Sequence, residues 1–141
     1  MNIPVLVLLG FAAWTLLTLF ASIGVYRWSR ILTGRATLAE WRADVPQGSE
    51  WYQRAMRAHM NCVENLPVYA VIVVAIIAAG LKSTALDLLS VAMLSARVGQ
   101  TLVHLGLEQT ETVTAIRFGL FFAQALCMIA MGVVVASAML A

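Results

Sequence analysis

Polar and charged side chains are concentrated in the stretch Arg54 to Glu64, which leads directly into a long apolar run. Each residue of an α-helix advances by about 100°, so side chains three and four positions apart share a face. Four side chains in the stretch fall within an arc of roughly 80°; they are Arg54, Arg57, Asn61 and Glu64. His59 points away from this arc. Guanidinium groups bind carboxylates through paired hydrogen bonds, so such a face is suited to holding an organic anion.

Two later apolar segments also carry polar groups at helical spacing. The first of them has Arg97, Thr101, His104 and Glu108 at intervals of four, three and four, with Gln100 adjacent. In the second, Arg117 lies in the second predicted turn. Whether these groups can meet the face that includes Arg57 depends on the elements that carry them.

The composition indicates that the chain is surrounded by lipid. Its residues are 62% hydrophobic and 11% charged, against about 45–50% and about 25% in soluble domains. A net charge of +2, with the basic residues mostly in one loop, argues against a nucleic-acid partner. The two cysteines lie in separate apolar segments without a cluster of histidines, so no metal site is predicted.

Four segments are long and apolar enough to span a bilayer core of about 30 Å as helices that rise about 1.5 Å per residue. We predict helices at about 3–28, 50–79, 84–105 and 111–140, with a loop at about 29–49. They form one domain over residues 1–141. Helix N-caps are predicted at Ser49 and at the pairs Thr37–Glu40 and Thr84–Asp87. The predicted fold class is an all-α integral membrane bundle of four transmembrane helices.

The distribution of basic residues predicts the orientation of this bundle. Six arginines lie in or beside the first loop, whereas the second loop has only Lys82. The positive-inside rule then places the first and third loops in the cytoplasm and both termini outside or in the lumen. We expect a multi-pass protein of the bacterial inner membrane, or of the endoplasmic reticulum in a eukaryote. Because consecutive helices cross the membrane in opposite directions, the polar ends of the last three helices lie at the same membrane depth.

Charged groups at this depth are costly, at about 2.5–3.5 kcal/mol near the bilayer centre on insertion scales, so they pair or face a cavity. We therefore expect Glu64 to pair with an arginine. Arg57, Arg97 and Arg117 outnumber this acid, and the surplus of positive charge predicts a bound anion. The polar groups are also compatible with interhelical contacts that fix the packing of an oligomer.

The stretch Arg57-Ala58-His59-Met60-Asn61-Cys62-Val63-Glu64, followed by Pro67, resembles the R-A-x-x-N-x-x-E signature of the MAPEG proteins. These are the membrane-associated proteins in eicosanoid and glutathione metabolism, which include the microsomal glutathione transferases. The length of the chain, its four spans, the basic first loop and an arginine early in the last helix extend the resemblance. It implies a homotrimer with glutathione bound as co-substrate between neighbouring subunits, near the cytoplasmic side.

The resemblance also implies roles for individual residues. Arg57, Asn61 and Glu64 match positions that contact glutathione, while Arg54 and His59 match positions close by. Arg117 matches the arginine that stabilises the glutathione thiolate, which makes it the expected catalytic residue. We include Arg97, Gln100 and His104, at the same depth, among the residues expected to bind glutathione. Either Arg27 or Arg30 matches an arginine that reaches the neighbouring site.

Some positions depart from the pattern of the leukotriene and prostaglandin synthases in this family. Those members have tyrosines where this chain has Gln100, His104 and Asn65, which weakens an eicosanoid assignment and leaves the role of His104 open. The function expected is a glutathione transferase or peroxidase acting on hydrophobic electrophiles or lipid hydroperoxides. The alternatives are a small proton-coupled multidrug-type transporter with Glu64 as proton carrier, and a non-catalytic lipid-binding protein of the same fold.

Overall fold

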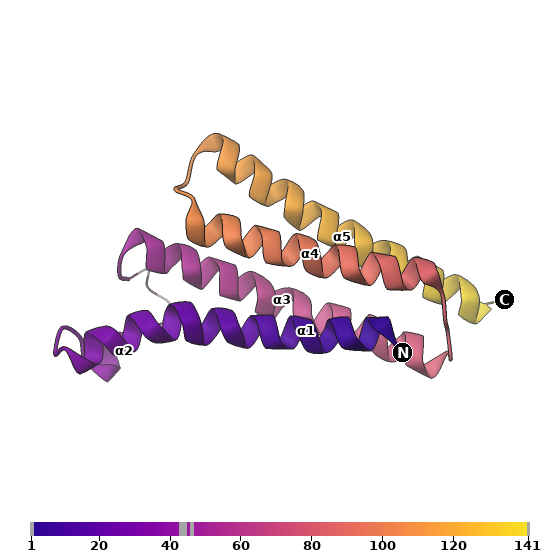
Figure 1. Cartoon of the computed structure of the whole chain (residues 1–141), viewed down its shortest axis with the longest axis horizontal. Helices are drawn as coiled ribbons and strands as arrows, with labels where there is room; N and C mark the ends of the chain where they lie inside the picture. The colour runs from indigo at the N-terminus through magenta and orange to yellow at the C-terminus, as the bar shows by residue number, and fades with distance from the viewer. Residues whose placement is uncertain (1, 43–44, 46, 141) are drawn as a thin grey trace.

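The computed structural model describes residues 2–42, 45 and 47–140, which form helices and connecting turns without any strand. Figure 1 shows the long helices side by side, with the chain reversing direction at each turn. The elements are α1 (Ile3–Thr18), the π-helix η1 (Leu19–Gly24), α2 (Val25–Leu32), the 3-10 helix η2 (Leu38–Glu40), α3 (Glu50–Ala78), α4 (Thr84–Gly106) and α5 (Glu111–Leu140). Within the described residues four helical segments are long and apolar enough to cross a membrane, which confirms the predicted fold class.

The first span is longer than predicted, because helical structure continues without a break from Ile3 to Leu32. The helix is terminated two residues later by Gly34, whose φ of 69° lies in the left-handed region that favours glycine. The amide of Gly34 donates to the carbonyl of Ile31 at 3.0 Å, and that of Arg35 donates to the carbonyl of Arg30 at 2.8 Å. These bonds satisfy the last carbonyls of the helix, as expected of a glycine C-terminal cap. The other three spans end within one residue of their predicted limits.

Two of the predicted helix caps form, and the third is displaced. The Ser49 hydroxyl accepts from the amide of Tyr52 at 3.3 Å at the start of α3, and Thr37 with Glu40 forms a capping box at η2. The predicted cap at Thr84 is wrong, because Ser83 is the N-cap of α4 and accepts from the amide of Ala85 at 3.2 Å. Ser83 has the extended backbone that an N-cap requires.

A π-helical segment, η1, interrupts the first span and was not predicted. Hydroxyl groups just before and within it bond to carbonyls one turn earlier, with Thr15 bound to Phe11 at 2.9 Å and Thr18 bound to Thr15 at 2.8 Å. Ser22 binds the carbonyl of Thr18 in the same way. Such bonds compete with the regular α-helical pattern, and a π-turn adds a residue to the turn. The residues after η1 therefore face α3 differently than they would on a straight helix.

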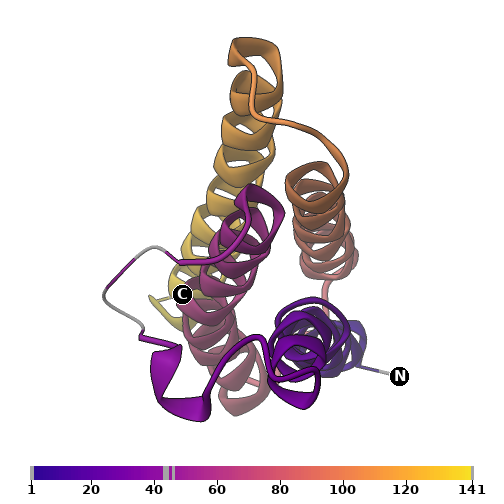
Figure 2. The same cartoon turned by 90° about the vertical axis from the view of Figure 1, so that its left-hand side faces the viewer.

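The core lies where α1, α3, α4 and α5 meet, and α4 packs against each of the other three. Figure 2, which looks along the bundle, shows the four helices around this centre. The core consists of Val7, Phe11, Cys62, Tyr69, Val73, Ile76, Leu86, Met93, Met128, Met131 and Val135. The first loop leads into the polar end of α3, and a short turn joins the polar ends of α4 and α5. Both connections lie at the same end of the bundle, opposite the two termini (Figure 1). The bundle thus brings these polar ends together.

Tyr69 ties α3 to the start of α1, far from the polar end of the bundle. Its side chain is fully buried and its hydroxyl donates to the carbonyl of Pro4 at 3.0 Å. We expect Tyr69→Phe to lower the free energy of unfolding by about 1 kcal/mol, the usual net value of one such hydrogen bond. Thermal unfolding in detergent measures this change. An unchanged stability would show that the bond contributes nothing to holding α1 against α3.

Candidate functional site

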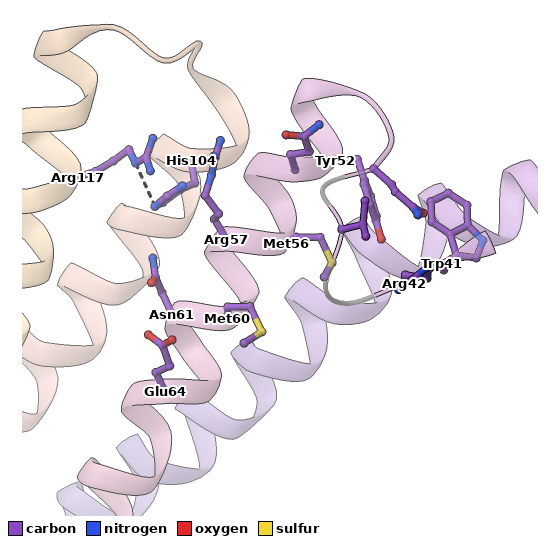
Figure 3. Close-up of a pocket in the computed structure, with 13 residues that line it drawn as sticks. Trp41, Arg42, Tyr52, Met56, Arg57, Met60, Asn61, Glu64, His104 and Arg117 are labelled. Atoms are coloured by element: carbon purple, nitrogen blue, oxygen red, sulfur yellow. Dashed lines mark hydrogen bonds between the residues drawn. The ribbon is translucent and has the colours of Figure 1, made fainter. Parts of the chain in front are cut away.

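A cavity of about 590 Å³ opens at the polar end of the bundle. Figure 3 shows that side chains from α3, α4 and α5 face it from one side. These polar lining residues are Arg57, Asn61, Glu64, His104 and Arg117. A second cavity of about 290 Å³ shares four of these residues and extends between α4 and α5, where Gln100, Thr114, Phe118 and Phe121 join the lining. The two cavities therefore share part of their polar lining.

The other side of the larger cavity carries both apolar and polar groups. Met56 and Met60 project from α3 beside the charged side chains (Figure 3). Trp41, Val45 and Tyr52 add apolar surface, and Arg42, Gln47 and Gln53 add polar groups. Flexible thioether side chains adapt to ligands of different shape. A single ligand-sized space thus offers both charged groups and apolar surface.

Arg117 is held by α4 at two points. Its Nε donates to Nε2 of His104 at 3.1 Å, and its own carbonyl accepts from Nε2 of Gln100 at 3.0 Å. Its Nη1 is buried and makes no hydrogen bond within the described residues. The guanidinium is therefore held in one orientation by its Nε, and its Nη1 remains without a partner and can donate to an anion.

Arg57 and Arg54 face different neighbours despite their similar positions on α3. Arg57 lines the cavity and donates from Nη2 to Oε1 of Gln109, in the turn after α4, at 3.3 Å. Arg54 does not line the cavity, and its Nε donates to the carbonyl of His104 at 3.2 Å. Arg54 thus supports the contact between α3 and α4 instead of facing the ligand space.

The structure does not bring His59 or Arg97 to the cavity. His59 follows Arg57 by two positions, which turns it by about 200° on the helix, and its Nδ1 lies 3.4 Å from Oγ1 of Thr18 on the first span. Arg97 is only 1% exposed; its Nη1 donates to Oε1 of Gln100 at 2.8 Å. The guanidinium carbon of Arg97 lies 5.9 Å from the ring centre of Phe11. Arg97 thus belongs to the bundle interior, whereas His59 is half-buried and faces the first span.

Glu64 lines both cavities but forms no ion pair with an arginine in the part of the chain that the structure describes. The expected pairing is therefore not formed. Among the described residues Glu64 is also the only carboxylate in the lining of either cavity. The charge around this space is positive overall, because Arg57 and Arg117 face a single acid. No group of three potential metal-binding side chains of the His, Cys, Asp and Glu types occurs within those residues.

An aromatic cluster that the sequence reasoning missed attaches the first loop to α3. The rings of Tyr26 and Tyr52 stack at 4.5 Å between centres, and Trp41 contacts Tyr52 edge-on at 5.5 Å. Nε of Arg27 donates to the hydroxyl of Tyr52 at 2.6 Å. Gly48 fits beside this cluster because a side chain there would come within 2.7 Å of the Tyr52 ring. The cluster fixes Trp41 at the cavity, and its only signal in the sequence was the group of aromatic residues in and on either side of the loop, Tyr26, Trp41, Trp51 and Tyr52.

The family model for MAPEG matches residues 5–137, which is nearly the whole chain. This chain belongs to the MAPEG family. No curated protein and no solved structure matches it. MAPEG is a family of membrane proteins that includes glutathione transferases. The match includes most of each of the four spans of this MAPEG protein and every described residue that lines its two polar cavities.

The cavity predicts where water reaches this MAPEG protein. Met60 lines the cavity, whereas Val71, on the same helix, is 69% exposed on an apolar stretch of the span. We expect Met60→Cys to react with a membrane-impermeant maleimide at least tenfold faster than Val71→Cys, because the reactive thiolate forms only in water. Mass spectrometry of the protein in vesicles opened to both sides measures both rates. Unmodified protein is the background control, since Cys62 is buried and Cys127 is half-buried. Equal rates would contradict a water-filled cavity at Met60.

Proposed function

We propose that this MAPEG protein is a membrane-bound glutathione transferase or peroxidase that holds glutathione as its thiolate. The observation that carries the proposal is the charge of the cavity. Arg57 and Arg117 line it from two helices, and Glu64 is the only acid among its described lining residues. Glutathione offers carboxylates and an ionisable thiol to these cations, and one ammonium group to the acid. Its charges complement those of the cavity.

The polar side chains divide the binding of the tripeptide among them. Arg57 takes a carboxylate of glutathione, since guanidinium and carboxylate match in geometry. Asn61 bonds to the peptide groups with its amide. Glu64 takes the α-ammonium group; its lack of an ion pair with Arg57 favours this role over orienting that arginine. We propose no role in direct contact for Arg54, His59 or Arg97, because these side chains do not line the cavity.

Arg117 supplies the catalytic effect. A free thiol has a pKa of about 8.5, so only a few per cent is thiolate at neutral pH. A guanidinium next to the sulfur favours the charged form and lowers this pKa. The unpartnered Nη1 of Arg117 is the donor suited to this contact. The thiolate then attacks an electrophilic carbon, a C–S bond forms, and the leaving group departs with its electron pair. With a hydroperoxide, the thiolate attacks the terminal oxygen, so that an S–O bond forms as the O–O bond breaks, and the alkoxide takes a proton from water and leaves as the alcohol. The sulfenic acid that remains then reacts with a second glutathione to give glutathione disulfide and water.

The second substrate is a hydrophobic electrophile or lipid hydroperoxide. Trp41, Met56 and Met60 add apolar surface within the same cavity as the polar groups. Such a compound is concentrated in the surrounding lipid, so it arrives from the membrane. We further propose that the protein acts as a homotrimer with the site between subunits, and that the first and third loops lie in the cytoplasm. The surplus of arginine in the first loop supports this orientation.

The central test of this proposal is the ionisation of bound glutathione. We expect the purified protein in detergent to bind glutathione and to give the ultraviolet absorbance of a thiolate at neutral pH. Arg117→Ala should raise the pKa of the bound thiol toward its free value of about 8.5 and lower turnover of a small electrophile by at least tenfold. Arg35→Ala, which removes an exposed arginine outside the cavity, is the matched control and should change neither.

Other outcomes would point to other functions. An unchanged thiol pKa in Arg117→Ala would contradict the role of that residue. Glutathione binding without turnover of any electrophile or hydroperoxide would indicate a non-catalytic binding protein. Proton-driven efflux from vesicles that is abolished by Glu64→Gln and indifferent to glutathione would indicate a transporter.

A further inference from the structure

His104 contacts the side chain to which the proposed function assigns the chemistry. It is 2% exposed, lies on α4 two residues before the helix ends, and lines both polar cavities. Figure 3 shows its ring directed at the guanidinium of Arg117, with the hydrogen bond between them drawn. The Arg117 Nε and His104 Nε2 atoms are 3.1 Å apart.

This hydrogen bond determines the protonation state of the imidazole. The arginine Nε carries a hydrogen and has no lone pair to accept with, so it can only donate. Nε2 of His104 must then accept, which requires a neutral ring with its hydrogen on Nδ1. In that state neither ring nitrogen has a lone pair free for another proton. His104 therefore cannot take the proton of a thiol while it binds Arg117.

Hydrogen bonds from neighbouring side chains hold the backbones of His104 and Arg117 in place. The backbone of His104 is held by Arg54, which donates to its carbonyl at 3.2 Å. The backbone of Arg117 is held by Gln100, which donates to its carbonyl at 3.0 Å. Gln100 is itself fixed, because its Oε1 accepts from Arg97 at 2.8 Å and from Gln124 at 3.2 Å. The ring and the guanidinium can thus meet without either backbone having to move.

We propose that neutral His104 is a positioning residue that orients Arg117 toward the thiol of bound glutathione, and that it is not the base that removes the thiol proton. This inference rests on the proposed function for the identity of the ligand. With Nε tied to His104, the guanidinium plane is fixed and Nη1 is directed away from the ring. The proton released by the thiol passes to water in the cavity.

Two amide substitutions separate positioning from proton transfer. The side-chain oxygen of glutamine reaches the place of Nε2 and can accept from Arg117, whereas the amide of asparagine ends one bond short, near the place of Nδ1. Neither amide titrates in this range. We expect His104→Gln to keep the thiol pKa and turnover within about threefold of the unchanged protein. His104→Asn should raise the thiol pKa and lower kcat at least tenfold, with a smaller change in KM.

A second readout follows Arg117 without any glutathione. In protein with ¹⁵N-labelled arginine, the Nε–H of Arg117 should exchange slowly with water, because it is hydrogen-bonded to His104 and partly buried. Its resonance is assigned by its loss in Arg117→Lys. His104→Gln should keep the slow exchange and His104→Asn should lose it. Thermal unfolding in detergent confirms that each variant is folded.

The outcomes separate this inference from the proposed function. If both amide variants lose thiolate and turnover equally, His104 acts as the base and the inference is wrong. If both keep slow exchange at Arg117, another group orients the guanidinium and the inference is wrong. If the unchanged protein binds no glutathione, the proposed function fails, and the Nε–H exchange rates still decide whether His104 orients Arg117.

Discussion

A guanidinium inside an apolar bundle is costly unless protein groups replace the water that solvates it elsewhere, and one end of this structure is arranged around that constraint. Arg97 meets it only in part, because its Nη1 donates to Gln100 while its buried Nε and Nη2 make no hydrogen bond within the described residues. Gln100 is the centre of the arrangement. Its oxygen accepts from Arg97 and Gln124, and its nitrogen donates to the carbonyl of Arg117. Through it α4 and α5 are held together, and Arg117 is placed at the cavity.

The same constraint explains the division of the arginines into two groups. Arg54 and Arg97 donate hydrogen bonds to other groups of the protein and do not line the cavity. Arg57 and Arg117 line the cavity. With Glu64 unpaired in the described chain, the cavity presents separated charges of both signs. A zwitterionic ligand with more carboxylate than ammonium groups fits this pattern. The membership of the chain in a family that includes glutathione transferases agrees with such a ligand.

Much of this organisation could be predicted from the sequence, because it depends on helix periodicity and membrane thickness. Spacing alone placed Arg57, Asn61 and Glu64 on one face, and antiparallel crossing brought His104 and Arg117 to the same end. The direction in which a buried side chain turns could not be predicted this way. Arg97 shares its helix with His104 but lies about 10 Å further along the axis and packs on Phe11. The contribution of Trp41 depended on edge-on ring contacts between the loop and the helices beside it, for which periodicity gives no signal.

The measurement that tests the central claim most directly is the proton balance of glutathione binding. Calorimetric titrations in buffers of different ionisation enthalpy, near neutral pH, count the protons released when glutathione binds. S-methylglutathione, which has the same charges but no ionisable thiol, is the reference ligand. A cavity that binds the thiolate should release protons with glutathione beyond any released with the methylated analogue. Equal proton release for the two ligands, with both bound, would contradict the account that this cavity stabilises a thiolate.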